Sequence, residues 1–148
     1  LLEIIEKPKW KGNDTDEIPA NATLIPDLIS IPKVGGIDYF IIFDAKYYNL
    51  QLEKGKRLRG NPGVGDVTKQ YLYQIAYKNF IEAHNIVVVK NCFLMPTEGN
   101  EIIDKGIVKM DMLEALGLEN IQIRLIPASL MYEHYLSQKK IDVSLLNL

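Results

Sequence analysis

Tyr39-Phe40-Ile41-Ile42-Phe43-Asp44-Ala45-Lys46 is a run of apolar residues that ends in two opposite charges. Its β-branched and aromatic content predicts a strand buried on both faces. Alternate side chains of a strand project from the same face, so Asp44 and Lys46 stand side by side and Ala45 points the other way. Because an unpaired buried charge is unfavourable by several kcal/mol, these two charges need partners or a function.

A second strand is predicted upstream, over residues 24–31. Residues 32–38, with Gly35-Gly36, supply the turn residues of a hairpin. The hairpin would bring Asp27, which follows Pro26, beside Asp44. Two neighbouring carboxylates form a site for a hard cation such as Mg²⁺, which prefers oxygen ligands.

Such a metal site suits phosphodiester hydrolysis, since a bound metal lowers the pKa of its water and stabilises charge on the scissile phosphate. Lys46 would orient or deprotonate the water, or stabilise the extra charge of the transition state. The sequence leaves these roles of Lys46 open. The plainer interpretation is a turn at Pro26-Asp27 and a surface ion pair between Asp44 and Lys46, because short motifs often match by chance. The joint order of the two motifs favours the metal site.

Pro26-Asp27 followed by Asp44-Ala45-Lys46 resembles the motif of the PD-(D/E)XK nuclease superfamily, with Asp in the second acidic position. The likeness continues through residues 43–48 and 61–64 and from Asp66 to Gln74. Over this region the chain is similar to the LlaJI-type restriction endonucleases, a branch that is itself similar to the McrC nuclease subunits.

The resemblance implies an α/β chain with the PD-(D/E)XK restriction-endonuclease-like fold, a central mixed β-sheet flanked by helices. It implies a magnesium-dependent endodeoxyribonuclease domain of a restriction system, with Mn²⁺ as a substitute for Mg²⁺. The metal would be bound by Asp27, Asp44 and the Ala45 carbonyl. The catalytic residues would be Asp27, Asp44, Lys46 and Gln70, with Gln70 positioning the lysine or a phosphate.

Basic residues gather in the segment 51–65, between the predicted strand and the next helix. Cations near a nuclease site contact phosphates and add affinity through counterion release. We therefore expect DNA contacts from Lys56, Arg57 and Arg59, and from Lys69 on the helix. Solvated surface charge is the alternative. The glycines of this segment do not form a nucleotide-binding loop, because no Gly-Lys-Ser/Thr follows them.

The clearest helix is predicted over residues 66–84, with one apolar stripe expected to pack on the sheet: Leu72, Ile75, Ala76, Phe80 and Ala83. An adjacent stripe faces either the metal site or solvent: Asp66, Gln70, Tyr73 and Tyr77. Strands are expected over residues 87–94, with Cys92 buried, over 106–110, and, half-exposed, over 120–126. A closing helix over residues 129–140 would pack through Leu130, Met131, His134 and Tyr135.

The composition is that of an ordinary globular chain of 148 residues, so we expect a single nuclease domain over 1–148. A net charge of −2 argues against a stand-alone nonspecific DNA binder. The chain opens with Leu1-Leu2-Glu3, which resembles the end of a helix, so it is expected to be the C-terminal catalytic part of a longer protein. Many relatives add an acidic ligand from a helix before the hairpin, for which Glu3 and Glu6 are the candidates.

The expected substrate is double-stranded DNA, and the resemblance implies a nucleotide-driven AAA+ partner subunit of the GTPase type. Cleavage of both strands requires two nuclease sites, as in a dimer, or sequential nicking. A lone cysteine and the lack of a long apolar segment favour a cytoplasmic location without a membrane. One alternative is a noncatalytic assembly domain that binds a partner. Another is a DNA repair exonuclease of the same fold, although one cysteine excludes a four-cysteine iron–sulfur cluster.

Overall fold

Strand β5 (Ile37–Ala45) carries the apolar run in the computed structural model, which describes residues 1 and 3–148. It belongs to a six-stranded sheet in the order β3-β5-β6-β8-β7, with β4 paired to the start of β5. The other strands are β3 (Leu28–Ser30), β4 (Lys33–Val34), β6 (Val88–Thr97), β7 (Ile103–Val108) and β8 (Ile121–Pro127). β5, β6 and β8 run parallel, whereas β3, β4 and β7 pair antiparallel. The predicted central mixed sheet is confirmed.

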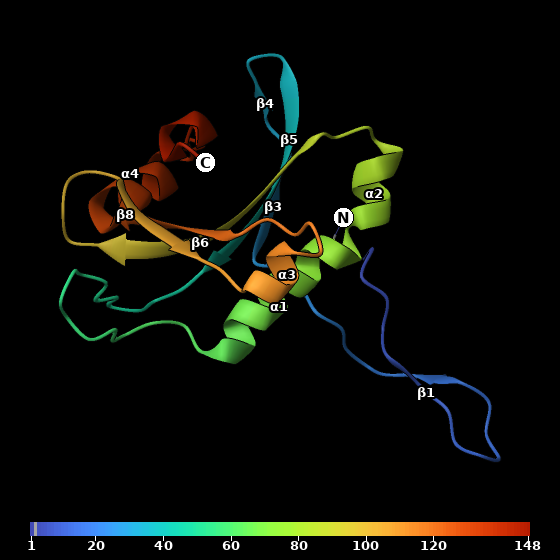
Figure 1. The fold of residues 1–148 in the computed structure, drawn as a ribbon. Helices are drawn as coiled ribbons and strands as arrows, with labels where there is room; N and C mark the ends of the chain where they lie inside the picture. Colours follow the sequence, from blue (N-terminus) through green and yellow to red (C-terminus); the bar gives the residue numbers. More distant parts are fainter. Residues whose placement is uncertain (2) are drawn as a thin grey trace.

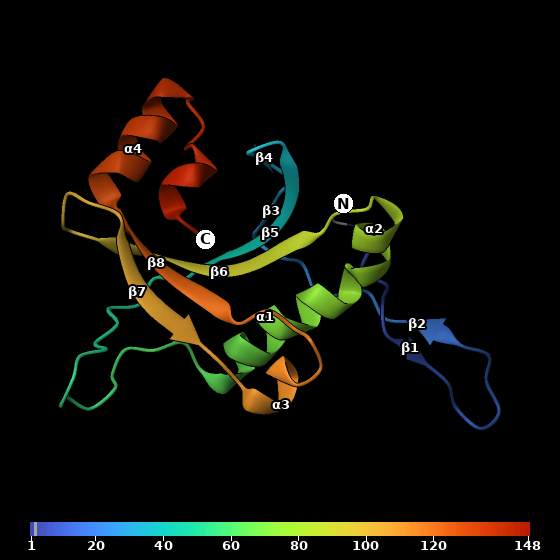
Figure 2. The ribbon, with the colours of Figure 1, turned by 45° about the horizontal axis from the view of Figure 1, so that its top comes forward.

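Helices cover both faces of this sheet, and a small two-stranded sheet projects from it (Figure 1). The helices are α1 (Val64–Ala76), α2 (Lys78–Ala83), α3 (Asp111–Glu114), α4 (Ala128–Ser137) and the 3₁₀ helix η1 (Val143–Leu146); the small sheet is β1 (Lys9–Trp10) with β2 (Ile18–Pro19). Figure 2 shows α1 and α4 on opposite sides of the sheet. Among the described residues, no helix is both long and apolar enough to span a bilayer.

The alternation along β5 divides its side chains between the two faces. Phe40 and Ile42 pack with Tyr73 and Tyr77, from α1 and its end. Ile41 and Phe43 lie in a different cluster, with Cys92 and Leu146. Asp44 continues the register of Phe40 and Ile42, so its side chain belongs to the face that α1 covers.

The predicted helix over residues 66–84 is wrong in two respects. It divides at Tyr77 into α1 and α2, and its most buried face is the polar-aromatic one, although Ala76 and Phe80 of the predicted stripe also pack against the core. Leu72 and Ile75, expected on the sheet, are 44% and 50% exposed. The tyrosine and glutamine side chains pack there because their polar ends have partners: the Tyr73 hydroxyl, for example, donates to the carbonyl of Ile25 at 2.8 Å.

The strand predicted over residues 120–126 is confirmed as β8, but its predicted half-exposure is wrong, because β8 lies between β6 and β7 and is largely buried. Arg124 is only 2% exposed. Its guanidinium donates to the carbonyls of Leu146 and Asn147 and pairs with Asp104 at 2.9 Å. These bonds compensate for the burial of the charge.

Three further predictions concern α4, the first residues of the chain and Cys92. In α4 only Leu130 of the predicted face packs against the core, while Tyr135 is 80% exposed and Met131 is 36% exposed. Leu1 and Glu3 are not helical, and Leu2 lies outside the described residues. Cys92 is fully buried as predicted, and burial raises the pKa of its thiol to about 12.

Gly60 closes the loop between β5 and α1, and a side chain there would be strongly unfavourable. Its φ is +61°, and a Cβ would overlap the backbone carbonyl oxygen of Asn49. Gly60→Ala should therefore lower the free energy of unfolding by about 1–3 kcal/mol in urea titrations. Gly55→Ala is the matched control, because Gly55 also has a positive φ but open space around it. Equal losses in the two variants would show that the contact with Asn49 has no effect.

Candidate active site

The hairpin places Asp27 beside Asp44, as predicted, although its first strand is only Leu28–Ser30 and not the predicted 24–31. Leu28 is paired with Phe43, so Asp27 lies next to the end of β5. Its Oδ2 accepts a hydrogen bond from the Ala45 backbone N–H at 2.9 Å. Asp27 is exposed, whereas Asp44 is only 2% exposed. The pair therefore has one solvent-exposed carboxylate, Asp27, and one buried carboxylate, Asp44.

Lys46 lies between two carboxylates that come from different elements. Its Nζ is 2.8 Å from Asp44 Oδ2 and 2.9 Å from Asp66 Oδ1. It also lies 6.0 Å from the centre of the Phe93 ring. The contact with Asp66 is a hydrogen bond, but the contact with Asp44 is an ion pair by distance alone, because Asp44 Oδ2 accepts no hydrogen bond. This buried carboxylate oxygen is therefore held by a close ion pair with Lys46 and not by a well-aligned hydrogen bond.

The pKa values of this cluster follow from burial and charge. Burial, and then the Asp27 carboxylate, raise the pKa of Asp44. The interaction with Asp44 lowers the pKa of Asp27 despite some burial. Burial opposes the charge of Lys46, but its contacts with Asp44 and Asp66 outweigh burial and raise its pKa to about 12. At neutral pH Lys46 is therefore an ammonium, which donates hydrogen bonds.

The raised pKa of Asp44 makes its charge unfavourable for folding. We expect Asp44→Asn to raise the thermal midpoint at pH 7 by about 2–4 °C, equivalent to about 1 kcal/mol in a chain of this size. A folded-state pKa above the ordinary value of 3.8 means that the charge opposes folding only at higher pH. The gain should thus fade as the pH falls through the folded-state pKa of Asp44 and vanish below 3.8, where the carboxyl is protonated in both states. A lower midpoint at pH 7 in scanning calorimetry would contradict this.

Gln70 lies at the centre of the molecule and does not reach Lys46 through any of its observed hydrogen bonds. It is fully buried, and its Nε2 donates to the carbonyl of Ile42 at 3.3 Å and to Asn91 Oδ1. The Asn91 side chain returns a bond to the Gln70 carbonyl at 3.1 Å. Gln70 therefore connects α1 to β5 and β6, at Ile42, two residues before Asp44.

The expected DNA-contact residues lie on the loop between β5 and α1 and on α1 itself. Lys56, Arg57 and Arg59 are exposed in the loop that joins β5 to α1, and Lys56 pairs with Glu53. Lys69 is half-buried on α1, and its charge lowers the pKa of both Asp27 and Asp66. The loop begins and ends at the cluster, since Lys46 precedes it and Asp66 follows it.

Asp66 is the site residue that sequence reasoning did not assign. The only signals were its place on the stripe with Gln70 and its position in the first turn of a helix. Neither Glu3 nor Glu6, the upstream candidates, lies in a helix; both are exposed, and Glu6 pairs with Lys9 at 4.0 Å. Within the described residues, no group of three or more His, Cys, Asp or Glu side chains is arranged to hold a metal ion. The candidate ligand set is therefore the Asp27–Asp44 pair with backbone oxygen.

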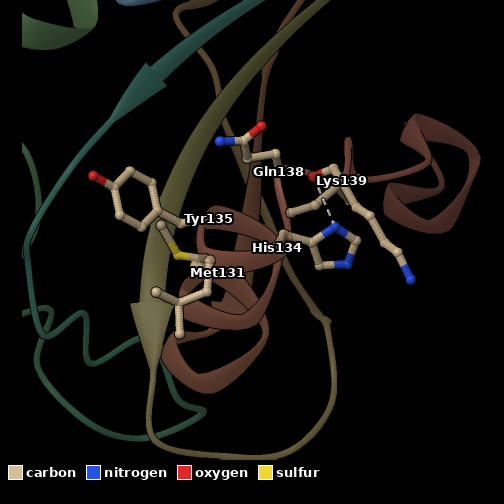
Figure 3. Close-up of a pocket in the computed structure, with 7 residues that line it drawn as sticks. Met131, His134, Tyr135, Gln138 and Lys139 are labelled. Atoms are coloured by element: carbon tan, nitrogen blue, oxygen red, sulfur yellow. Dashed lines mark hydrogen bonds between the residues drawn. The ribbon is translucent and has the colours of Figure 1, made fainter.

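A hollow of about 730 Å³ lies elsewhere, beside α4 (Figure 3). Its lining is Met131, His134, Tyr135, Leu136, Gln138, Lys139 and Ile141. It contains no carboxylate, and the His134 Nδ1 is engaged with the carbonyl of Lys139 at 3.1 Å. The carboxylate cluster is therefore the candidate site, and this hollow is not.

Comparison with known proteins agrees with the resemblance drawn from the motifs. The family model described as LlaJI restriction endonuclease matches residues 2–134. The Type II restriction enzyme BsuMI component YdjA of Bacillus subtilis (strain 168) is 35% identical over 138 residues, which make up 91% of this chain and 28% of that protein. The chain thus spans less than a third of the length of this relative. No solved structure matches the chain.

Proposed function

This chain belongs to the LlaJI restriction endonuclease family, and from this premise we propose that it is the part of a restriction enzyme that hydrolyses DNA phosphodiester bonds. The proposed activity is that of a magnesium-dependent endodeoxyribonuclease, with Mn²⁺ as a substitute. The observation that carries the proposal is the convergence of Asp27, Asp44 and Lys46 at the end of β5. The PD-(D/E)XK fold is part of the same proposal.

The residues present fit a hard divalent cation. Asp44 offers carboxylate oxygens from β5 and Asp27 from the residue before β3, and the Ala45 carbonyl is the third proposed ligand. The buried Asp44 Oδ2 has the Lys46 ammonium beside it but no well-aligned hydrogen bond, and the raised pKa of Asp44 indicates that its charge lacks full compensation. When bound there, Mg²⁺ would supply Lewis-acid stabilisation of the charge on the scissile phosphate.

Lys46 has the positive charge and the position needed to contact the scissile phosphate of the proposed DNA substrate. Its Nζ is 2.8 Å from the proposed ligand Asp44, so a phosphate brought to the carboxylate pair would lie within its reach. As an ammonium it donates protons in hydrogen bonds, to a phosphate oxygen or to the attacking water. Both contacts favour the transition state, in which negative charge increases. Proton abstraction by Lys46 is disfavoured by the same ion pairs.

The exposed basic loop is the proposed DNA contact. On an inactive Asp44→Asn background, replacing Lys56, Arg57 and Arg59 together by Ala should flatten the salt dependence of DNA binding, by about one unit of log–log slope for each phosphate that is no longer neutralised. Filter binding from low to moderate salt measures this slope. The control variant replaces the exposed Lys7, Lys9 and Lys11, which gives the same change in net charge. Equal slopes in both triple variants would exclude the loop.

The protein is proposed to work in an assembly. The relative from Bacillus subtilis is named as a component of an enzyme, which supports partner subunits for this chain. We propose an AAA+ partner of the GTPase type, and either a dimer or sequential nicking for cleavage of both strands of double-stranded DNA.

Plasmid cleavage tests the proposed activity. Supercoiled DNA should be nicked or linearised by the chain with Mg²⁺ or Mn²⁺ and remain intact with EDTA. Cleavage that persists in EDTA would contradict a metal-dependent site. DNA that stays intact under every condition would contradict cleavage by this chain acting alone.

A further inference from the structure

Lys46 is held by anions from two elements, and only one of them belongs to the proposed metal pair. Asp44 lies on the same strand as Lys46, whereas Asp66 lies in the first turn of α1. The two contact distances, 2.8 and 2.9 Å, are nearly equal. A cation on Asp44 would repel the ammonium and compete for the same carboxylate. Lys46 then needs an anion that the cation does not use.

Asp66 is well placed to be that anion. The positive end of the helix dipole favours a carboxylate in the first turn of α1. Lys46 lowers the pKa of Asp66, so that Asp66 is ionised at neutral pH. One turn along α1, Gln70 donates to the carbonyl of Ile42, two residues before Asp44. Asp66 is therefore fixed relative to β5 through the helix and not through the loop alone.

We infer that Asp66 is a positioning residue, which holds the Lys46 ammonium beside the metal pair and leaves the oxygens of Asp27 and Asp44 to the cation. This inference rests on the proposed function. The competing role for Asp66 is that of a third metal ligand. The two roles differ in one respect, because a positioning residue acts through Lys46 and a ligand acts without it.

Mn²⁺ affinity measured by isothermal titration separates these roles. In the chain with Lys46 present, Asp66→Asn should weaken Mn²⁺ binding about tenfold, at the lower end of the effects of groups that orient metal ligands. Asp66→Glu should restore most of the affinity. In a Lys46→Ala background, Asp66→Asn should change the affinity by less than about threefold, because no ammonium is left to redirect.

An equal loss of Mn²⁺ affinity in both backgrounds would overturn the inference and make Asp66 a ligand. The matched control is Asp111→Asn, which removes a carboxylate that is also in the first turn of a helix and also pairs with a lysine, at 3.1 Å from Lys109. If Asp111→Asn lost as much Mn²⁺ affinity as Asp66→Asn, the inference about Asp66 would also be overturned.

Failure of the proposed function gives a different result, since the wild-type chain would then not bind Mn²⁺ at all. Thermal unfolding still tests the contact in that case. Lys46→Ala and Asp66→Asn break the same ion pair, so their shifts in thermal midpoint should be less than additive in the double variant. Additive shifts would show that Asp66 does not hold Lys46.

Discussion

Asp44→Asn should lower metal-dependent DNA cleavage by about three orders of magnitude, equivalent to ~4 kcal/mol of lost transition-state stabilisation. The substitution keeps the shape of the side chain and removes the buried negative charge beside Asp27. Initial rates of plasmid nicking at saturating Mg²⁺ give the measurement. Asp38→Asn is the matched control, because Asp38 lies on the same strand and is exposed in an ion pair with Lys33 at 3.3 Å.

The same substitution should leave the fold at least as stable. Loss of cleavage without loss of stability would separate a role of Asp44 in the chemistry from a role in packing. Residues placed for packing lose stability when changed, whereas Asp44 opposes folding through its buried charge. An inactive variant that is at least as stable as the wild type would locate the role of Asp44 in the chemistry. Nicking at the wild-type rate by Asp44→Asn would show that the Asp27–Asp44 pair is not the active site.

Lys46→Ala should lower cleavage by about 10²–10³-fold, the effect of removing one donor aimed at developing negative charge. The loss should appear in kcat, since the ammonium would contribute mainly in the transition state. Single-turnover nicking over a range of protein concentrations separates kcat from binding. The control is Lys33→Ala, which removes an exposed lysine of another ion pair near the start of β5.

A loss confined to KM in Lys46→Ala would assign Lys46 to DNA binding instead. Full activity would exclude it from both roles. Stability must be checked in parallel, because removal of Lys46 leaves the buried Asp44 without its closest cation.

The hairpin and the Asp27–Asp44 pairing were predictable from local chemistry. The apolar run ending at Phe43 marks a buried strand, and Gly35-Gly36 supplies the positive φ values of the turn, 58° and 82°. Together they fix the hairpin register, which determines that Asp27 and Asp44 meet. Such short-range signals lie within one hairpin, so they do not depend on the rest of the fold.

The orientation of α1 was not predictable in the same way. Its apolar stripe at Leu72 and Ile75 is a better match to a core face by hydrophobicity alone. The tyrosine face packs on the sheet because distant groups, such as the Ile25 carbonyl, satisfy its polar ends. Asp66 was missed for the same reason. Its contact with Lys46 spans twenty residues and exists only because α1 docks through Gln70.

The burial of β8 likewise depends on tertiary partners. Gln122 and Arg124 alternate with apolar residues, which is the pattern of a half-exposed strand. The chain end after α4 folds over this strand and accepts the hydrogen bonds of Arg124 through backbone carbonyls. A sequence pattern shows the polarity of a side chain, but it does not show which hydrogen-bond acceptor that side chain will contact in the folded protein.

Mn²⁺ binding to the wild-type chain, compared with Asp27→Asn and Asp44→Asn, tests the central claim most directly, because it needs neither DNA nor a partner subunit. We predict one bound ion per wild-type chain and an affinity at least about tenfold lower in each variant. Asp38→Asn should bind as the wild type does. Equal affinity in the wild type, Asp27→Asn and Asp44→Asn would contradict a metal site at this pair.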